Sequence, residues 1–298
     1  MKNNLKYYAA AAIVIAAAAV LFTSCAGSDL NSTVFVTSMG ISLDKNIYSA
    51  ALYGSCASKD GETSVSAFGT GRTPAEAMNS ARLDCGKNLF LGHCERVAAD
   101  SAALRNSAFL ADFSDSVISP ACKVYFSDSP ERAAENISNE GFVTENYQLA
   151  VCMKNGTPAV IPIAEDPSRI AVITAEETII MDSEDSMGIM IMRDRSYPKV
   201  ITAAVGEHFE SIKISPKTVR KAYFSDGILN VDITVRLNAQ GGSEEGRKAV
   251  VSLFGIICRS SFEKTVNTMG IDSINISALT DYTRQQLKTA RLNLTVKY

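Results

Sequence analysis

Residues 69–99 of the chain, GTGRTPAEAMNSARLDCGKNLFLGHCERVAA, contain its strongest structural signals. Thr73 is a natural N-cap, Pro74 suits the first helical position, and Glu76 three residues after the cap completes a capping box. Gly86 can adopt the left-handed conformation that ends a helix. The sequence therefore predicts a helix that begins after Thr73 and stops at Gly86.

Residues 88–98, NLFLGHCERVA, follow this helix and are predicted to form a strand. They include His93, one of two histidines in the chain, directly before Cys94. Because neighbouring side chains of a strand point to opposite faces, His93 and Cys94 would not share a proton directly. We therefore interpret both as structural residues, with Gly92 allowing a bulge or a close backbone approach.

The segments around this stretch alternate between strand and helix patterns. Strands are predicted over residues 33–43, 47–56, 65–69 and 121–126, and helices after Asp100 or Ser101 and after Asp128 or Ser129. Residues 141–167 are predicted to be less regular. This half of the chain is therefore predicted to be a mixed α/β domain.

The second half of the chain has a different pattern. Short strands are predicted at 199–206, 208–215, 217–224 and 228–238, then a helix over 244–268, a short polar helix over 277–288 and a closing strand at 291–298. Val250, Leu253, Phe254 and Ile257 form an apolar helical stripe that must cover a sheet. The predicted fold class is α+β, with a mixed α/β N-terminal domain (26–165) followed by an antiparallel sheet packed against a long C-terminal helix (166–298).

Residues 1–25 have the pattern of an export signal. Lys2 and Lys6 precede an uncharged apolar run over residues 7–22, and Thr23 and Ser24 lead into Cys25. The run is shorter than the about 20 apolar residues that a spanning helix needs. The segment resembles a bacterial lipobox, so we expect Cys25 to carry a lipid after cleavage. The alternative is an ordinary secretory signal with an incidental cysteine.

The composition argues against several classes of protein. The chain has 298 residues, is 46% hydrophobic and carries a net charge of -3, with no run of Lys or Arg, so a nucleic-acid partner is not expected. After Cys25, six cysteines remain at positions 56, 85, 94, 122, 152 and 258, and none has the CxxC spacing of a zinc or redox motif. We expect buried thiols, although disulfides stay possible.

No catalytic constellation stands out in the sequence. His93 and His208 are the two possible histidine bases, and a GxSxG nucleophile elbow is absent. The segment GTGRTPAEA is neither GxGxxG nor a Walker motif. The carboxylate pairs Glu176-Glu177, Glu184-Asp185 and Glu244-Glu245 are predicted to be solvated in turns or at a helix start. We therefore expect no enzyme, no cofactor and no metal site.

Several motifs together resemble the C subunit of bacterial spore germinant receptors, the Ger(x)C lipoprotein family. The matching residues are the signal with Cys25, Met39-Gly40-Ile41, the helix start with Gly71, Thr73, Glu76 and Ala77, the run Leu89-Phe90-Leu91-Gly92-His93 with Val97, residues 169–192, and the helix from Ser243 with Gly270-Ile271-Asp272. Ser42 stands where the family has an aspartate, and the tryptophan common after the lipid cysteine is missing.

The resemblance implies a lipid-anchored subunit of a receptor in the inner spore membrane, with its domains on the outer side. Its partners would be a multi-spanning A subunit and an integral B subunit, and membrane lipid through Cys25. The role would be assembly, stability or signal transmission, and direct nutrient binding stays open. The alternatives are a lipid-anchored solute-binding protein, which would need two similar lobes around a cleft, and an anchored hydrolase.

Overall fold

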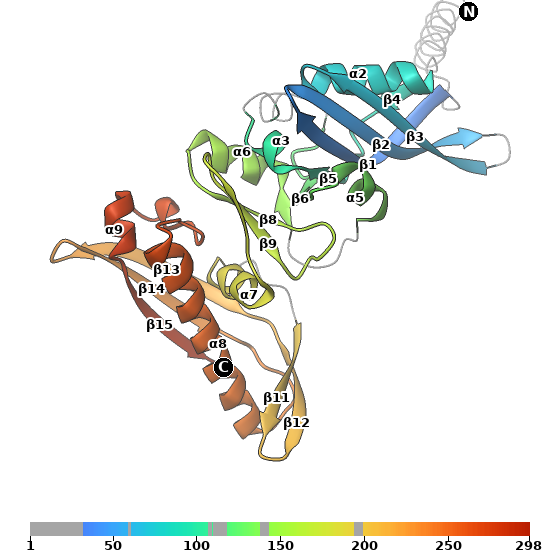
Figure 1. Cartoon of the computed structure of the whole chain (residues 1–298). Helices are drawn as coiled ribbons and strands as arrows, with labels where there is room; N and C mark the ends of the chain where they lie inside the picture. The colour runs from blue at the N-terminus through green and yellow to red at the C-terminus, as the bar shows by residue number, and fades with distance from the viewer. Residues whose placement is uncertain (1–31, 59–60, 107–108, 110–117, 138–142, 194–198) are drawn as a thin grey trace, which may run out of the picture.

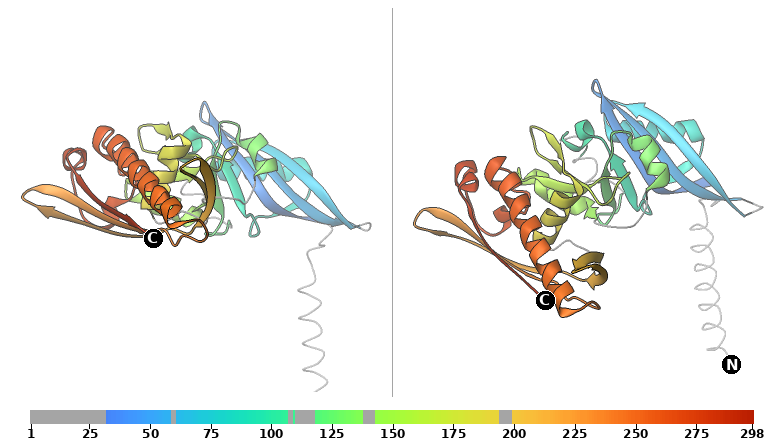
Figure 2. Two further views of the ribbon diagram at one scale, coloured as in Figure 1. Left: turned by 90° about the horizontal axis from the view of Figure 1, so that it is seen from below. Right: turned by 60° about the horizontal axis from the view of Figure 1, so that its bottom comes forward.

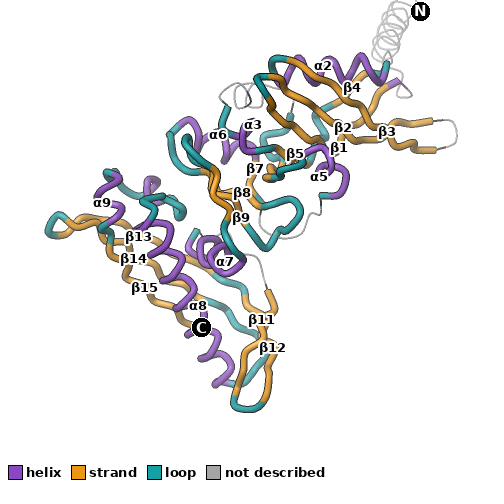
Figure 3. The backbone as a smooth tube through the Cα atoms, in the orientation of Figure 1, coloured by secondary structure: helices purple, strands orange, loops and turns teal. Residues whose placement is uncertain are grey.

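The structure is a computed structural model, and it describes residues 32–58, 61–106, 109, 118–137, 143–193 and 199–298. The predicted signal 1–25, including Cys25, lies outside the described residues. Within them the chain is α+β, as predicted, and its helices and sheets follow one another in three groups (Figures 1 and 3). No described helix is long and apolar enough to cross a membrane.

The first group is a seven-stranded mixed sheet with the order β3-β2-β1-β5-β6-β7, in which β4 also pairs with β1. β1 (Thr33–Asp44), β2 (Ile47–Ser58) and β3 (Gly61–Gly71) are antiparallel, β4 (Asn88–Phe90), β5 (Arg96–Ala99) and β6 (Lys123–Phe126) run parallel to β1, and β7 (Thr144–Glu145) is antiparallel to β6. Its helices are α2 (Pro74–Cys85), α3 (Ser101–Leu104), α5 (Pro130–Asn136) and α6 (Asn146–Lys154).

Helix α2 has the caps that its sequence predicts. The Thr73 hydroxyl accepts from the Glu76 N–H at 3.1 Å, and Gly86 follows the helix with a φ of 62°. The Glu76 carboxylate accepts from the Arg72 N–H at 2.7 Å. The helix lies so close to β3 that a Cβ on Gly69 would come within 2.3 Å of two backbone atoms of α2. Glycine at this position lets the helix cover the sheet.

The prediction of one continuous strand over residues 88–98 is wrong for residues 91–95, which belong to neither strand. The chain forms β4 and β5 with a turn between them, where the Cys94 N–H donates to the Leu91 carbonyl at 2.9 Å. The Glu95 N–H donates to the Thr37 carbonyl of β1 at 2.9 Å. The segment thus leaves β1 and then returns to it, and His93 and Cys94 lie in the turn.

The irregular segment predicted over 141–167 contains a helix. Glu145 and Gln148 form a capping box at the start of α6, with the Glu145 N–H donating to Gln148 Oε1 at 3.4 Å. Glu is outside the usual group of N-cap residues, so the signal was missed. The helix predicted after Asp100 is confirmed at its start, since the Asp100 carboxylate accepts from the Ala103 N–H at 2.7 Å. Its predicted length is wrong, because α3 ends at Leu104, and most of the residues after Asn106 in the predicted helix lie outside the described residues.

The second group is a three-stranded antiparallel sheet with helix α7 beside it. It contains β8 (Ala159–Pro162), β9 (Ile170–Ile173), β10 (Thr178–Ile180) and α7 (Ser183–Met192). The predicted domain boundary between residues 165 and 166 falls in the connection of β8 and β9, which pair with each other. The division into 26–165 and 166–298 stays a prediction.

The third group is the antiparallel pair β11 and β12, and the sheet β13-β14-β15 with the long helix α8 on one face. Its elements are β11 (Lys199–Val205), β12 (His208–Ile214), β13 (Lys217–Ser225), β14 (Ile228–Arg236), α8 (Glu244–Phe262), the π-helix η2 (Glu263–Thr268), η3 (Ile276–Ala278), α9 (Arg284–Lys288) and β15 (Arg291–Lys297). β15 pairs with β14 in parallel, whereas β13 and β14 are antiparallel.

The apolar stripe of α8 is largely as predicted. Val250 and Phe254 are buried against the sheet, and Cys258 widens the stripe. Ile257 is also buried. Leu253 is 40% exposed, so its predicted place in the core is wrong. The single helix predicted over 277–288 is replaced by η3 and α9 with a loop between them.

Candidate functional site

The two side chains of the His93–Cys94 turn lie in different surroundings. His93 is exposed, and its ring centroid lies 5.2 Å from that of Phe90 and 6.1 Å from that of Phe35. Cys94 is 1% exposed, and its thiol donates to the Arg96 carbonyl at 3.4 Å. The turn thus holds His93 on an aromatic surface and Cys94 in the core.

The six described cysteines are free thiols. Cys94 and Cys122 precede the adjacent parallel strands β5 and β6, and both are buried in one apolar core. A hydrogen bond with Cys94, together with burial, raises the pKa of the Cys122 thiol. Burial also raises the pKa of Cys258 to about 12. These thiols stay protonated at neutral pH, which disfavours nucleophilic chemistry.

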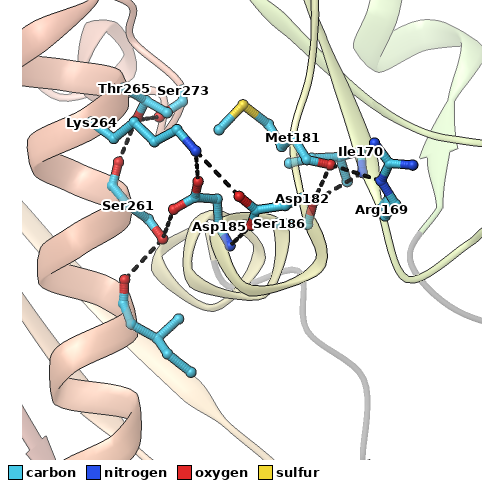
Figure 4. Close-up of polar contacts among 11 residues, drawn as sticks. Arg169, Ile170, Met181, Asp182, Asp185, Ser186, Ser261, Lys264, Thr265 and Ser273 are labelled. Carbon is cyan, nitrogen blue, oxygen red and sulfur yellow. Dashed lines mark hydrogen bonds and ion pairs between the residues drawn. The ribbon is translucent and has the colours of Figure 1, made fainter.

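The most developed polar cluster joins α7 to the end of α8 (Figure 4). We call it the α7–α8 junction, and it comprises Asp182, Asp185, Ser261 and Lys264. The Lys264 ammonium pairs with Asp185 and, at 3.2 Å, with Asp182. The Ser261 hydroxyl lies 3.3 Å from Asp185 Oδ1 and 2.8 Å from the Ile257 carbonyl oxygen. The sequence prediction of a solvated Glu184-Asp185 pair is wrong for Asp185, which is buried.

Asp182 and Lys264 of the junction are ionised at neutral pH. The Asp182 carboxylate caps α7 by accepting from the Asp185 N–H at 2.8 Å, and this bond, followed by Lys264, lowers the pKa of Asp182. Hydrogen bonding to Asp185 raises the pKa of Lys264. One ammonium beside two carboxylates makes a fixed ion pair, and the lowered pKa makes Asp182 a weak base.

Two further hydrogen bonds lie beside the junction, one between β9 and α7 and one at the end of α8. The Ile170 N–H of β9 donates to the Ser186 hydroxyl of α7 at 3.1 Å, and the Thr265 hydroxyl donates to the Ser261 carbonyl at 2.7 Å. Gly188 faces Ser261 so closely that a Cβ there would lie 2.2 Å from the hydroxyl oxygen. The junction therefore ties the middle sheet to the long C-terminal helix.

A second buried carboxylate organises the loop between η2 and α9. Asp272 is 2% exposed and accepts from the N–H groups of Ile276 and Ser277 and from the Tyr282 hydroxyl, at 2.6, 2.8 and 2.7 Å. Burial and the Asp272 charge raise the pKa of Tyr282. The full set of donors around this carboxylate indicates a structural role.

Two surface cavities of the described residues have mostly polar side chains in their walls. A cavity of about 540 Å³ lies where α5 meets the segment after β8, and its walls are Ser129, Arg132, Ala133, Asn136, Ala164, Glu165 and Pro167. Another of about 380 Å³ is lined by residues of β1, β2, β3, Arg96 and Glu135. Within the described part of the chain, no group of three or more His, Cys, Asp or Glu side chains is placed to hold a metal ion.

The remaining residues singled out in the sequence lie apart from these clusters. His208 is exposed at the start of β12, and Glu176 is exposed between β9 and β10. Glu244 begins α8 and pairs with Lys248 at 2.7 Å. The structure thus brings none of these described residues together with His93, and Cys25 lies outside the described residues.

Comparison with known proteins gives a fold and no family. No family model and no curated protein matches the chain. The structure matches the crystal structure of the GerBC protein with a TM-score of 0.54, over 88% of this chain and 96% of that chain, at 9% sequence identity. At this identity the match shows the fold alone. The chain therefore has a GerBC-like α+β fold.

Proposed function

We propose that the chain is the lipid-anchored C subunit of a spore nutrient germinant receptor. It acts without catalysis in receptor assembly and signal transmission. The observation that carries this proposal is the GerBC-like fold, which extends over 88% of this chain and 96% of that chain. A match over only part of either chain would support the proposal less strongly. One fold can host different functions, so the sequence motifs are needed as well.

The sequence supports the same proposal through motifs that a fold comparison does not use. The early Met39-Gly40-Ile41 turn, the Gly71–Ala77 helix start and the Gly92-His93 pair occur in the order of the Ger(x)C family. In the structure they lie on β1, at the start of α2 and in the turn before β5, all within the first group of elements. Fold and motifs therefore support one family independently.

Anchoring through Cys25 is part of this proposal. A thioether-linked diacylglyceryl group on Cys25 would hold the domains at the outer side of the inner spore membrane. Each buried CH₂ contributes about 0.8 kcal/mol, so two acyl chains suffice for stable attachment without a spanning helix. The partners would be the membrane A and B subunits of the receptor.

A lipid-anchored solute-binding protein is the alternative function. It would need two similar lobes that close around a ligand. The described residues instead form a seven-stranded mixed sheet at one end and a three-stranded sheet under α8 at the other. This dissimilarity favours the receptor subunit over the solute-binding protein.

The test uses the full-length chain, tagged at its C-terminus, in spores of its own organism. Solubilised dormant-spore membranes should yield the two membrane subunits in a pull-down. Cys25→Ala should release the protein from the membrane and block germination on nutrients. Cys85→Ala is the matched control, because Cys85 is half-buried and outside the signal.

Two results would contradict the proposal. Recovery of the tagged protein without membrane subunits would argue against the receptor complex. Normal nutrient germination by Cys25→Ala spores, with the protein still on the membrane, would argue against the lipid anchor.

A further inference from the structure

One face of the sheet β13-β14-β15 is left open by the described elements. Helix α8 covers the other face, where Leu229, Val231, Ile233 and Val235 of β14 are fully buried. Figure 1 shows α8 lying across this sheet, and the side chains that alternate with the buried ones point away from the helix. These outward side chains form a surface of the third group that a partner can contact.

The outward side carries an unusual arrangement of charges. Lys217 of β13 pairs in register with Arg236 of β14, which in turn pairs with Lys297 of β15. All three side chains are exposed. Cβ atoms of directly opposed residues lie about 4.5–5.5 Å apart, and like charges at this spacing destabilise a sheet. The fold thus maintains a row of three cations, which we call the basic row.

The basic row has no acidic counterpart among the described residues. None of the ion pairs within the described ranges includes Lys217, Arg236 or Lys297. The outward carboxylate of this sheet, Asp232, is two rows away and accepts from Asn293 Nδ2 at 2.8 Å. The chain has a net charge of -3, yet these three adjacent cations create a local positive potential that attracts an external anion.

The neighbouring rows add side chains that suit a membrane interface. Val219 is 62% exposed and Tyr223 is 44% exposed on the same outward side of β13, with Lys221 between them. Tyrosine and lysine combine an apolar body with a polar tip, which favours the boundary between lipid headgroups and acyl chains. None of the cavities described above is lined by these residues.

We propose that the face bearing Lys217, Arg236 and Lys297 docks on the anionic phospholipid headgroups of the membrane. This inference deepens the proposed function, because the lipid on Cys25 would bring the chain to that membrane. In the left view of Figure 2, the beginning of β1 and the C-terminal end of β15 both lie along the lower edge of the molecule. A chain anchored just before β1 can therefore turn the basic row toward the same surface.

Docking of this face would give the chain a second, electrostatic hold on the membrane. Lipid anchors and basic patches act together in this way on other membrane-associated proteins. The long axis of the chain would then lie along the membrane, with α8 on the far side of the sheet. Receptor subunits could reach the exposed side of α8 in that arrangement.

The test measures binding to vesicles by the chain from residue 26 onward, which retains every described residue and lacks the signal and Cys25. Vesicles contain either phosphatidylcholine alone or phosphatidylcholine with about one third phosphatidylglycerol. Wild-type protein should co-sediment with the anionic vesicles and be released by high salt. Each cation near such a surface contributes about fivefold in affinity.

The variant K217Q/R236Q/K297Q should lose about 100-fold in affinity for the anionic vesicles. The matched control R132Q/K154Q/K248Q removes the same charge from exposed positions on α5, α6 and α8. It should keep wild-type affinity within about threefold. Circular dichroism spectra of both variants should match wild type, because all six substitutions are on exposed residues. The first variant relieves like-charge contacts, and the control loses only the exposed Lys248–Glu244 pair.

Two outcomes would overturn the inference. One is equal wild-type binding to neutral and anionic vesicles, and the other is an equal loss of affinity in the variant and its control. Either result would leave the proposed function standing, because receptor membership is tested separately by pull-down from spore membranes. Failure of that pull-down with retained vesicle binding would reject the receptor and keep the docking face.

Discussion

Replacing Gly188 by alanine tests how tightly α7 and α8 are joined. A Cβ at this position would lie 2.2 Å from Ser261 Oγ, 2.9 Å from Ser261 Cβ and 3.1 Å from the Ile257 carbonyl oxygen. The hydroxyl cannot rotate away without giving up its 2.8 Å hydrogen bond to Ile257. The substitution therefore forces the two helices apart or breaks that bond.

The magnitude follows from two opposing terms. Overpacking of this kind costs about 1–3 kcal/mol, and the lost hydrogen bond costs about 1 kcal/mol. Alanine gains about 1 kcal/mol over glycine in a helix. Gly188→Ala should therefore lower the free energy of unfolding by about 1–3 kcal/mol. Gly255→Ala in α8 is the control, because a Cβ there meets nothing within 4 Å, and it should raise that free energy by up to about 1 kcal/mol.

Thermal melting followed by circular dichroism separates the two variants. Their midpoints should differ by about 5–10 °C, with Gly255→Ala the higher. In a Ser261→Gly background, where the blocking side chain is gone, adding Gly188→Ala should cost nothing. Equal midpoints for Gly188→Ala and Gly255→Ala, or an unchanged cost in the Ser261→Gly background, would refute the contact between the helices.

Three further predictions concern charge, capping and thiol reactivity. Lys264→Met should lower the free energy of unfolding by about 1–3 kcal/mol in urea titrations, because it leaves the buried Asp185 carboxylate without its cation. A neutral effect would mean that the pair is solvated. Thr73→Ala should cost about 1 kcal/mol in the same assay, and Thr73→Ser should restore most of it, since the hydroxyl caps α2. At pH 9 folded Cys258 should resist iodoacetamide while half-buried Cys85 reacts, because burial raises the pKa of Cys258 to about 12. The neutral Cys258 thiol supports the fold below its unfolded pKa, so this stability should fall as the pH rises from about 9 to about 12.

The elements predicted best from the sequence are those whose signals are local. Thr73, Pro74 and Gly86 lie within one helix and its caps, and α2 begins and ends where they indicate. Capping depends on residues three or four apart, so one segment of sequence contains all the information. The same holds for the strands β11 to β14, whose turns and alternation are local.

Elements shaped by distant partners were predicted less well. The strand over 88–98 is interrupted because Glu95 donates to the Thr37 carbonyl, a contact between segments far apart in the sequence. Leu253 fits the helical stripe by spacing alone, yet it is 40% exposed. Periodicity gives a helix a wide apolar side, and the neighbouring sheet decides how much of that side is covered.

The α7–α8 junction and the basic row lie beyond sequence reasoning for the same reason. Asp185 adjoins Glu184 in the sequence and looks like part of a solvated acidic turn, but its partners Ser261 and Lys264 are 76 and 79 residues away.

Lys217, Arg236 and Lys297 become neighbours through strand register, which a search for runs of Lys or Arg does not detect. A one-residue shift of β13 against β14 would move Lys217 to the helix-covered side, where an unpaired ammonium would be costly to bury. The register that buries Val231 and Ile233 under α8 is therefore the same register that assembles the three cations outside. The buried core fixes the strand register, and this register places the three cations side by side, where they repel one another. An anionic surface would relieve that repulsion.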